Sequence, residues 1–241
     1  MREEELKTSP KQRIIISLIA ILMLGSMIAG YAVIIMNGGS KSATSETSET
    51  ISEEKILEYK EAYDAKLKEF QDATKSQYET LLAYKSEVKA YNETAANSGV
   101  SSRDLKKGSG RELGEGDKDY FAYYIGFCAD ESVFDSSFDD FENPSGFSAY
   151  GMLNLTEMSL IEGWYAGMVG AKVGGVREIT IPGELAYGDS TEICGGYNKP
   201  LRFIVLTEAV NEKLAALSSE VQLAAQKYEY AVYYGVDYDN L

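Results

Sequence analysis

The chain has 241 residues, 44% of them apolar and 25% charged, which is the composition of a globular domain with appended segments rather than of a disordered chain. It contains no His, and this excludes Ser-His-Asp and Cys-His catalysis and zinc sites with His ligands. With 23 basic and 38 acidic residues the formal net charge is −15. We expect no nucleic acid partner, because phosphate neutralisation needs clustered Lys and Arg.

Residues 14–36 form an uncharged, apolar run of 23 residues, long enough for a helix that crosses about 30 Å of hydrocarbon. A cleaved signal peptide would have a shorter apolar region and a small-residue cleavage site, so the run predicts a retained transmembrane anchor. Four bases precede the run within residues 1–13, whereas Lys41 is the only base in the first fifteen residues after it. This asymmetry predicts a single-pass protein with a cytoplasmic amino terminus and an extracytoplasmic remainder, at a cell surface or in a periplasm.

Residues 37–51 are mostly Gly, Ser and Thr and predict a flexible linker. An amphipathic helix is expected over residues 52–95, since 52–92 lacks Gly and Pro and has apolar residues at steps of three and four. Thr50 with Glu53 resembles a capping box at its start. If continuous, such a helix would be about 60 Å long.

Residues 102–210 hold most of the Gly and short alternating runs that predict a sheet-rich domain. The runs are Tyr120–Phe127, Val176–Ile181 and Leu201–Leu206. Between Leu160 and Val169 the apolar spacing changes to that of a helix, which we expect to cover the sheet.

A second amphipathic helix is expected from about Glu208 to Tyr233, so that residues 211–241 form a C-terminal amphipathic helix and tail. The two amphipathic helices can bury their apolar stripes against each other as a hairpin. The alternative is that they form a client-holding arm or a coiled coil that makes a homodimer.

Six short motifs of the middle segment occur in a characteristic order. They are Tyr124 with Gly126, Val133–Ser137, Leu160–Trp164, Gly170–Gly174, Ile181-Pro182 with Leu185–Gly188, and Pro200–Phe203. In this order the segment resembles the FKBP-type peptidyl-prolyl cis-trans isomerases. The resemblance implies an α+β fold, a twisted antiparallel sheet wrapped around a short helix, here flanked by two long amphipathic helices and an N-terminal transmembrane helix.

The resemblance also implies which residues enclose the proline ring of a substrate. Trp164 would form the floor, and the walls would be Tyr124, Phe134, Phe147, Leu160, Ile161 and Phe203. The Tyr187 hydroxyl would donate to a substrate carbonyl, the Ile161 N–H would bind another, and Asp135 would lie at the rim, hydrogen-bonded to Tyr124. No metal, cofactor or proton-transfer step is implied.

These observations predict a membrane-anchored prolyl isomerase that assists the folding of exported, Pro-containing polypeptides. Rotation of an X–Pro bond needs no covalent step, so a chain without His can catalyse it. The alternative is a binding module for Pro-containing segments, because DSTEICGGYNK at 189–199 replaces the family's usual Ile-Pro-rich lid. A third interpretation is a structural membrane protein whose coiled coil matters and whose middle domain is a spacer.

The two cysteines, Cys128 and Cys194, allow at most one intrachain bridge. Outside the cytoplasm they would form a disulfide if their Cα atoms lie within about 7 Å, and otherwise they are small apolar residues.

Overall fold

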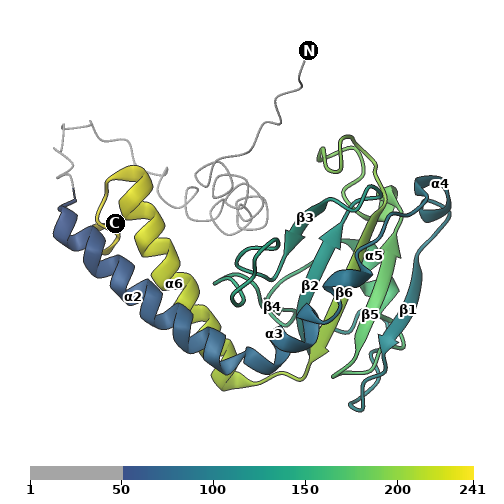
Figure 1. Cartoon of the computed structure of the whole chain (residues 1–241), viewed down its shortest axis with the longest axis horizontal. Helices are drawn as coiled ribbons and strands as arrows, with labels where there is room; N and C mark the ends of the chain where they lie inside the picture. Colours follow the sequence, from purple (N-terminus) through teal and green to yellow (C-terminus); the bar gives the residue numbers. More distant parts are fainter. Residues whose placement is uncertain (1–50) are drawn as a thin grey trace, which may run out of the picture. The chain divides into compact units, whose positions relative to one another are not determined.

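The computed structural model describes residues 51–241 (Figure 1). The predicted cytoplasmic segment 1–13, the predicted span 14–36 and nearly all of the predicted linker 37–51 lie outside the described residues. Within residues 51–241, no helix combines the length and the apolar character needed to cross a membrane.

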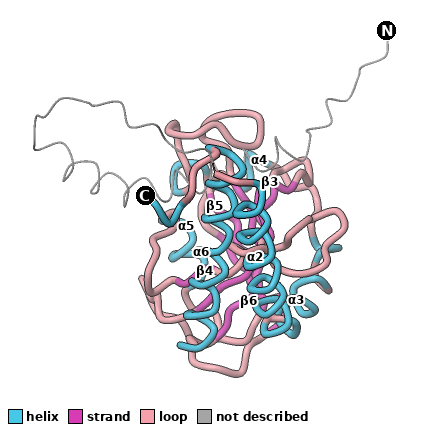
Figure 2. The backbone as a smooth tube through the Cα atoms, turned by 90° about the vertical axis from the view of Figure 1, so that its left-hand side faces the viewer, coloured by secondary structure: helices cyan, strands magenta, loops and turns pink. Residues whose placement is uncertain are grey.

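Two antiparallel helices form a hairpin from opposite ends of the described chain. Helix α2 spans Glu53–Ala73 and helix α6 spans Glu212–Tyr234. They lie side by side in both views (Figures 1 and 2), and the backbone bond from Ile51 N–H to Gly235 O closes the open end. Each start is capped by a side chain, Ser52 for α2 and Asn211 for α6. The prediction that the helices pack on each other is confirmed.

The prediction of one continuous helix over 52–95 is wrong. Helix α2 ends at Ala73, a separate helix α3 spans Lys75–Leu82, and only a 3-10 turn, η1 at Lys85–Glu87, and the short α4 at Glu93–Ala96 follow. The break occurs without Gly or Pro, at Thr74, whose φ of −106° and ψ of 12° depart from helical values and whose N–H and hydroxyl both donate to Phe70 O, at 2.9 and 2.8 Å. Phe70 and Leu81, on either side of the break, are both fully buried.

The middle of the chain forms an antiparallel sheet with strand order β1-β5-β6-β2-β3 and a short β4 paired with β2. The strands are β1 Ser101–Lys106, β2 Phe121–Phe127, β3 Val133–Ser136, β4 Leu153–Asn154, β5 Val176–Ile181 and β6 Leu201–Glu208. Helix α5 spans Glu162–Met168, and a 3-10 turn, η2, spans Gly183–Leu185. The three predicted strand runs, the predicted helix near 160–169 and the α+β class are confirmed.

Both faces of the sheet are buried, so β2 has no charged residue and every residue of β5 is buried, including Arg177 and Glu178. Against one face pack helix α5 and a group that we call the α5-side cluster, which includes Ala122, Tyr124, Trp164, Ile179 and Phe203. Against the other face pack the base of the hairpin, helix α3 and the loop 138–150. We call this second group the hairpin-side cluster, and it includes Phe70, Leu81, Tyr123, Phe147 and Val221. Because side chains alternate along a strand, neighbours on β2 belong to different clusters.

Helix α5 lies close to the sheet because it places two glycines against β5. A Cβ atom on Gly163 would lie 2.2 Å from Ile181 Cγ2, and one on Gly167 would lie 3.0 Å from Ile179 Cβ. The two glycines are four residues apart and therefore share one face of the helix. This close contact determines how near Trp164, which lies between the two glycines in the sequence, comes to the sheet.

Candidate active site

Aromatic rings from three strands and one helix converge on the α5 side of the sheet. Tyr124 comes from β2, Phe134 from β3, Phe203 from β6 and Trp164 from α5. The ring centroid of Trp164 is 5.4 Å from that of Phe203 and 6.1 Å from that of Tyr124, both in edge-to-face arrangements. Phe134 meets Phe203 edge to face at 5.6 Å. The structure thus brings together four of the predicted site residues in favourable aromatic geometry.

Gly126 makes this convergence possible. A Cβ atom at position 126 would lie 2.7 Å from Phe134 Cζ and 2.9 Å from Phe203 Cε1. Any larger residue at position 126 would therefore push the rings of Phe134 and Phe203 apart. The opposing residue on β3 is Asp135, which pairs with Gly126 in the strand register.

Trp164 is held at the base of the group by a hydrogen bond that sequence reasoning missed. Its side chain is 2% exposed, and its indole Nε1–H donates to the Tyr120 hydroxyl at 3.1 Å. Burial raises the pKa of Tyr120 to about 12, although the Trp164 bond opposes the shift. No motif or spacing marked Tyr120, because its role depends on a contact across 44 positions of sequence.

Polar groups lie at the rim of the aromatic group. The Tyr124 hydroxyl donates to Asp135 Oδ2. Loss of water raises the pKa of Tyr124 well above its usual value, and the charge of Asp135 adds to this shift. Loss of water also raises the pKa of Asp135, with the bond from Tyr124 opposing.

Tyr187, 36% exposed, stands in the same electrostatic surroundings. Desolvation raises the pKa of its hydroxyl, and the Asp135 carboxylate raises it further. The Tyr187 hydroxyl therefore stays protonated at neutral pH and can donate a hydrogen bond to a neutral acceptor. Nothing in this arrangement requires a proton to be transferred.

Leu160 and Ile161 extend the group at the start of α5, where both pack partly buried against the α5-side cluster. Ile161 occupies the N-cap position of α5, and its carbonyl accepts from Trp164 N–H at 3.0 Å. Its own N–H has no hydrogen-bond acceptor among residues 51–241, so it is available to a ligand. The Leu160 N–H, by contrast, donates to the Tyr165 hydroxyl at 3.0 Å.

The prediction that Phe147 lines the same group is wrong. Phe147 is fully buried in the hairpin-side cluster, where its ring stacks on Tyr123 with centroids 4.5 Å apart. The long loop 138–150 carries it across the sheet edge, and Gln71 of α2 fixes it there by donating from Nε2 to Phe147 O at 2.9 Å. The resemblance predicts Phe147 as a wall of the group, but the path of the loop determines which face of the sheet the side chain reaches.

The segment 189–200 is tied to the sheet by a disulfide between Cys128 and Cys194, whose Cα atoms are 5.5 Å apart. Cys128 directly follows β2, so the bridge brings the segment to the end of the central strand. Ile193 and Cys194 pack partly buried against the α5-side cluster. The segment thus borders the aromatic group, and its conformation is restrained by a covalent bond.

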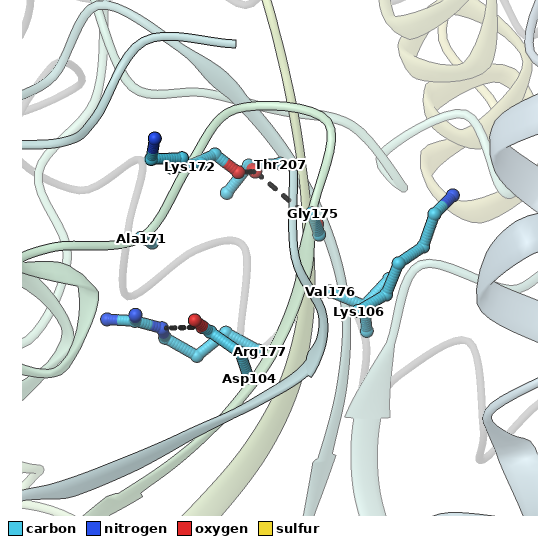
Figure 3. A pocket seen from close by; sticks show the side chains of 8 residues that line it. All are labelled: Asp104, Lys106, Ala171, Lys172, Gly175, Val176, Arg177 and Thr207. Carbon is cyan, nitrogen blue, oxygen red and sulfur yellow. Dashed lines mark hydrogen bonds and ion pairs between the residues drawn. The ribbon is translucent and has the colours of Figure 1, made fainter. Parts of the chain in front are cut away.

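A shallow surface hollow, with essentially no enclosed volume, lies elsewhere, where β1, β5 and β6 run side by side (Figure 3). Its most buried charge, Arg177, is paired: Nε donates to Asp104 Oδ1 at 2.6 Å and NH1 donates to Val169 O, outside the hollow, at 2.7 Å. None of its lining residues belongs to the aromatic group, and we assign it a structural role. The described part of the chain also contains no cluster of three or more Asp, Glu or Cys side chains placed to hold a metal ion.

Comparisons with known proteins agree with the position of the aromatic group. A family model described as FKBP-type peptidyl-prolyl cis-trans isomerase matches residues 114–206. The "FK506-binding protein" of Neisseria meningitidis serogroup B is 34% identical over 90 residues, which cover 37% of this chain and 75% of that protein.

Two further matches are a longer relative and a solved structure. "FK506-binding protein 4" of Chaetomium thermophilum is 38% identical over 90 residues, which cover 37% of this chain but only 17% of the relative's length. The crystal structure of a peptidyl-prolyl cis-trans isomerase from Pseudomonas syringae aligns at 22% identity with a TM-score of 0.35, covering 57% of this chain and 96% of that chain.

Proposed function

The chain belongs to the FKBP-type peptidyl-prolyl cis-trans isomerase family, and we propose that it isomerises X–Pro bonds of polypeptides at the aromatic group around Trp164. The observation that carries the proposal is the convergence of Tyr124, Phe134, Trp164 and Phe203, with the hydrogen bond from the Tyr124 hydroxyl to Asp135 at its rim. The pyrrolidine ring of proline is apolar and compact, and it can pack against such a surface.

The chemistry that this surface supports is bond rotation. A planar X–Pro amide must cross a barrier of about 18–20 kcal/mol, and at the top of the barrier resonance between nitrogen and carbonyl is lost. The twisted amide is less polar than the planar one, so apolar surroundings favour it over the ground state. Catalysis then needs only a shaped apolar surface and a few donors that fix the neighbouring carbonyls.

We assign those donors to Tyr187 and Ile161. The protonated Tyr187 hydroxyl and the Ile161 N–H, which has no acceptor within residues 51–241, can each bind a substrate carbonyl at this aromatic group. Asp135 acts on Tyr124, which it holds by a hydrogen bond, and keeps that ring in place. Leu160 and Phe134 complete the walls.

We further propose that the chain works at the outer face of a membrane, on exported Pro-containing polypeptides. The uncharged run 14–36 supplies an anchor with a cytoplasmic amino terminus. The Cys128–Cys194 disulfide supports the outer face, because such bonds persist in oxidising compartments. Protease that reaches the outer face of the anchoring membrane, with that membrane intact, should degrade residues 51–241. Protection of this region would contradict the location.

The activity is tested with the purified full chain in detergent micelles and short X–Pro peptides. We expect catalysed isomerisation, inhibition by FK506, the ligand in the relatives' names, and a loss of about tenfold or more in kcat/KM for Tyr187→Phe and for Asp135→Ala. Trp164, the only Trp of the chain, reports peptide binding by its fluorescence. A folded chain that binds Pro peptides without catalysis would instead establish the recognition module.

A further inference from the structure

The segment 88–100 connects the helical hairpin to β1 and lies outside the family-matched residues 114–206. We call it the strap. It contacts residues 182–200, which we call the site loop. Cys194 of this loop packs against the α5-side cluster, and the charge of Asp135 at the rim raises the pKa of Tyr187. The strap reaches this loop at both of its ends.

Tyr91 makes the largest set of contacts. Its hydroxyl lies 2.9 Å from Pro200 O and 3.2 Å from Phe127 O, so its single proton is shared between the end of the site loop and the end of β2. Its backbone N–H donates to Ala129 O at 3.0 Å, and the Arg202 guanidinium lies 4.3 Å above its ring centroid. Tyr91 therefore holds the residues on both sides of Cys128, which bridges to the site loop.

Two further side chains of the strap hold the site loop. Asn97 Oδ1 accepts from Gly183 N–H at 2.9 Å, at the start of the loop. Glu93 accepts from Lys199 Nζ at 2.9 Å, at its end. The two ends also touch each other, since a Cβ atom on Gly183 would lie 2.1 Å from Asn198 O.

We propose that the strap positions the site loop for isomerisation, with Tyr91 as a positioning residue that acts through Tyr187. The strap closes the base of the loop at Gly183, Lys199 and Pro200, and the disulfide fixes its far side at Cys194. Tyr187 lies between these fixed points, so its hydroxyl is directed by them. This inference rests on the proposed isomerase function and extends it to residues outside the family match.

The test compares two hydroxyls of equal chemistry in the full chain. Tyr91→Phe removes the bond to Pro200 O, and the control Tyr78→Phe removes a bond of the same 2.9 Å length to Pro144 O in the loop 138–150. We expect Tyr91→Phe to lower kcat/KM about fivefold, the factor carried by one ordinary hydrogen bond, and Tyr78→Phe to leave it unchanged. Both should shift the thermal unfolding midpoint by similar small amounts.

A double-mutant cycle separates positioning from general weakening. If Tyr91 acts through Tyr187, the effect of Tyr91→Phe on kcat/KM disappears in a Tyr187→Phe background. Equal effects in both backgrounds would overturn the proposal. At the other end of the loop, Asn97→Ala should reduce kcat/KM, whereas Asn97→Asp, which keeps an acceptor oxygen, should restore it.

Hydrogen exchange distinguishes failure of the strap from failure of the proposed function. Tyr91→Phe should speed amide exchange in residues 183–199 and leave residues 138–150 unchanged, and Tyr78→Phe should do the reverse. Exchange in 183–199 that does not respond to Tyr91→Phe would overturn the strap even in an active enzyme. A wild type without isomerase activity but with the expected exchange pattern would overturn the isomerase assignment. The strap would then hold the site loop without serving catalysis.

Discussion

The two faces of the sheet use the same strands and the same kinds of ring for opposite purposes. On the hairpin side Phe70 of α2, Tyr123 of β2 and Phe147 of the loop 138–150 are fully buried against one another's elements. On the α5 side a helix of seven residues covers only part of the sheet, so Trp164 and Phe203 are buried while Tyr124 and Phe134 stay partly exposed. Site and core differ here in how completely the rings are covered, and not in their composition.

The first prediction tests this contrast at its strongest point. Phe147→Ala should lower the free energy of unfolding by about 3–5 kcal/mol, because it opens a cavity in a fully buried cluster. Activity per folded molecule should be unchanged, since the ring faces away from Trp164. Denaturant unfolding followed by Trp164 fluorescence measures the stability. A loss of kcat/KM in a fully folded variant would mean that Phe147 does line the substrate-binding surface.

The second prediction concerns the covalent restraint beside the site. Reduction of the Cys128–Cys194 disulfide, which closes a loop of 66 positions, should lower the free energy of unfolding by about 2–4 kcal/mol. The double variant Cys128→Ser and Cys194→Ser is the control, because its unfolding should not respond to reductant. A wild type that is equally insensitive would mean that the bridge contributes nothing to stability.

Much of the α5 side could be predicted from the sequence, because its residues stand in contiguous motifs. The strand Val176–Ile181 and the ring set Tyr124, Phe134, Trp164 and Phe203 follow from local pattern and motif order. Phe147 could not be placed, because its face depends on the path of a long loop. The break at Thr74 could not be predicted either, because neither Gly nor Pro marks it and the two sides of the break, at Phe70 and Leu81, are fixed by burial in the folded chain.

The residues that hold the site through long-range hydrogen bonds could not be predicted from the sequence either. Tyr120 and Tyr91 act through contacts across 44 and 109 positions, and neither lies in a motif. Tyr120 is fully buried and its hydroxyl accepts from the Trp164 indole, whereas Tyr91 is half-buried and its hydroxyl is shared between Pro200 O and Phe127 O. Long-range polar contacts of this kind have no period and no local spacing, so only the folded chain reveals them.

The third prediction sharpens the comparison by removing one such support. Tyr120→Phe leaves the buried indole N–H of Trp164 without its acceptor and should cost about 1–3 kcal/mol of stability. It should also shift the emission of Trp164, which a substitution on the hairpin side would not do at equal folding. Tyr123→Phe is the matched control: the Tyr123 hydroxyl is buried and has no partner within residues 51–241, so its removal should be neutral or stabilising.

The smallest effect is a pH dependence at the edge of the hairpin side. Burial raises the pKa of Glu229 on α6, and the Tyr150 hydroxyl, 3.4 Å away, opposes the shift. Tyr63 faces the same carboxylate, and burial raises its pKa to about 12, so it stays neutral. The folded state therefore binds the proton of Glu229 more tightly than the unfolded state, and stability falls as pH rises from the usual carboxyl pKa through the raised one.

Glu229→Gln cannot ionise and keeps an acceptor oxygen for Tyr150, so it should remove this penalty. Its melting temperature should match that of the wild type near pH 4 and exceed it at pH 7. Asp135→Asn, on the α5 side, should show a difference of the same sign, because desolvation also raises the pKa of Asp135. Only Asp135→Asn should also change kcat/KM, since Glu229 helps to seal a core whereas Asp135 borders the surface that binds substrate.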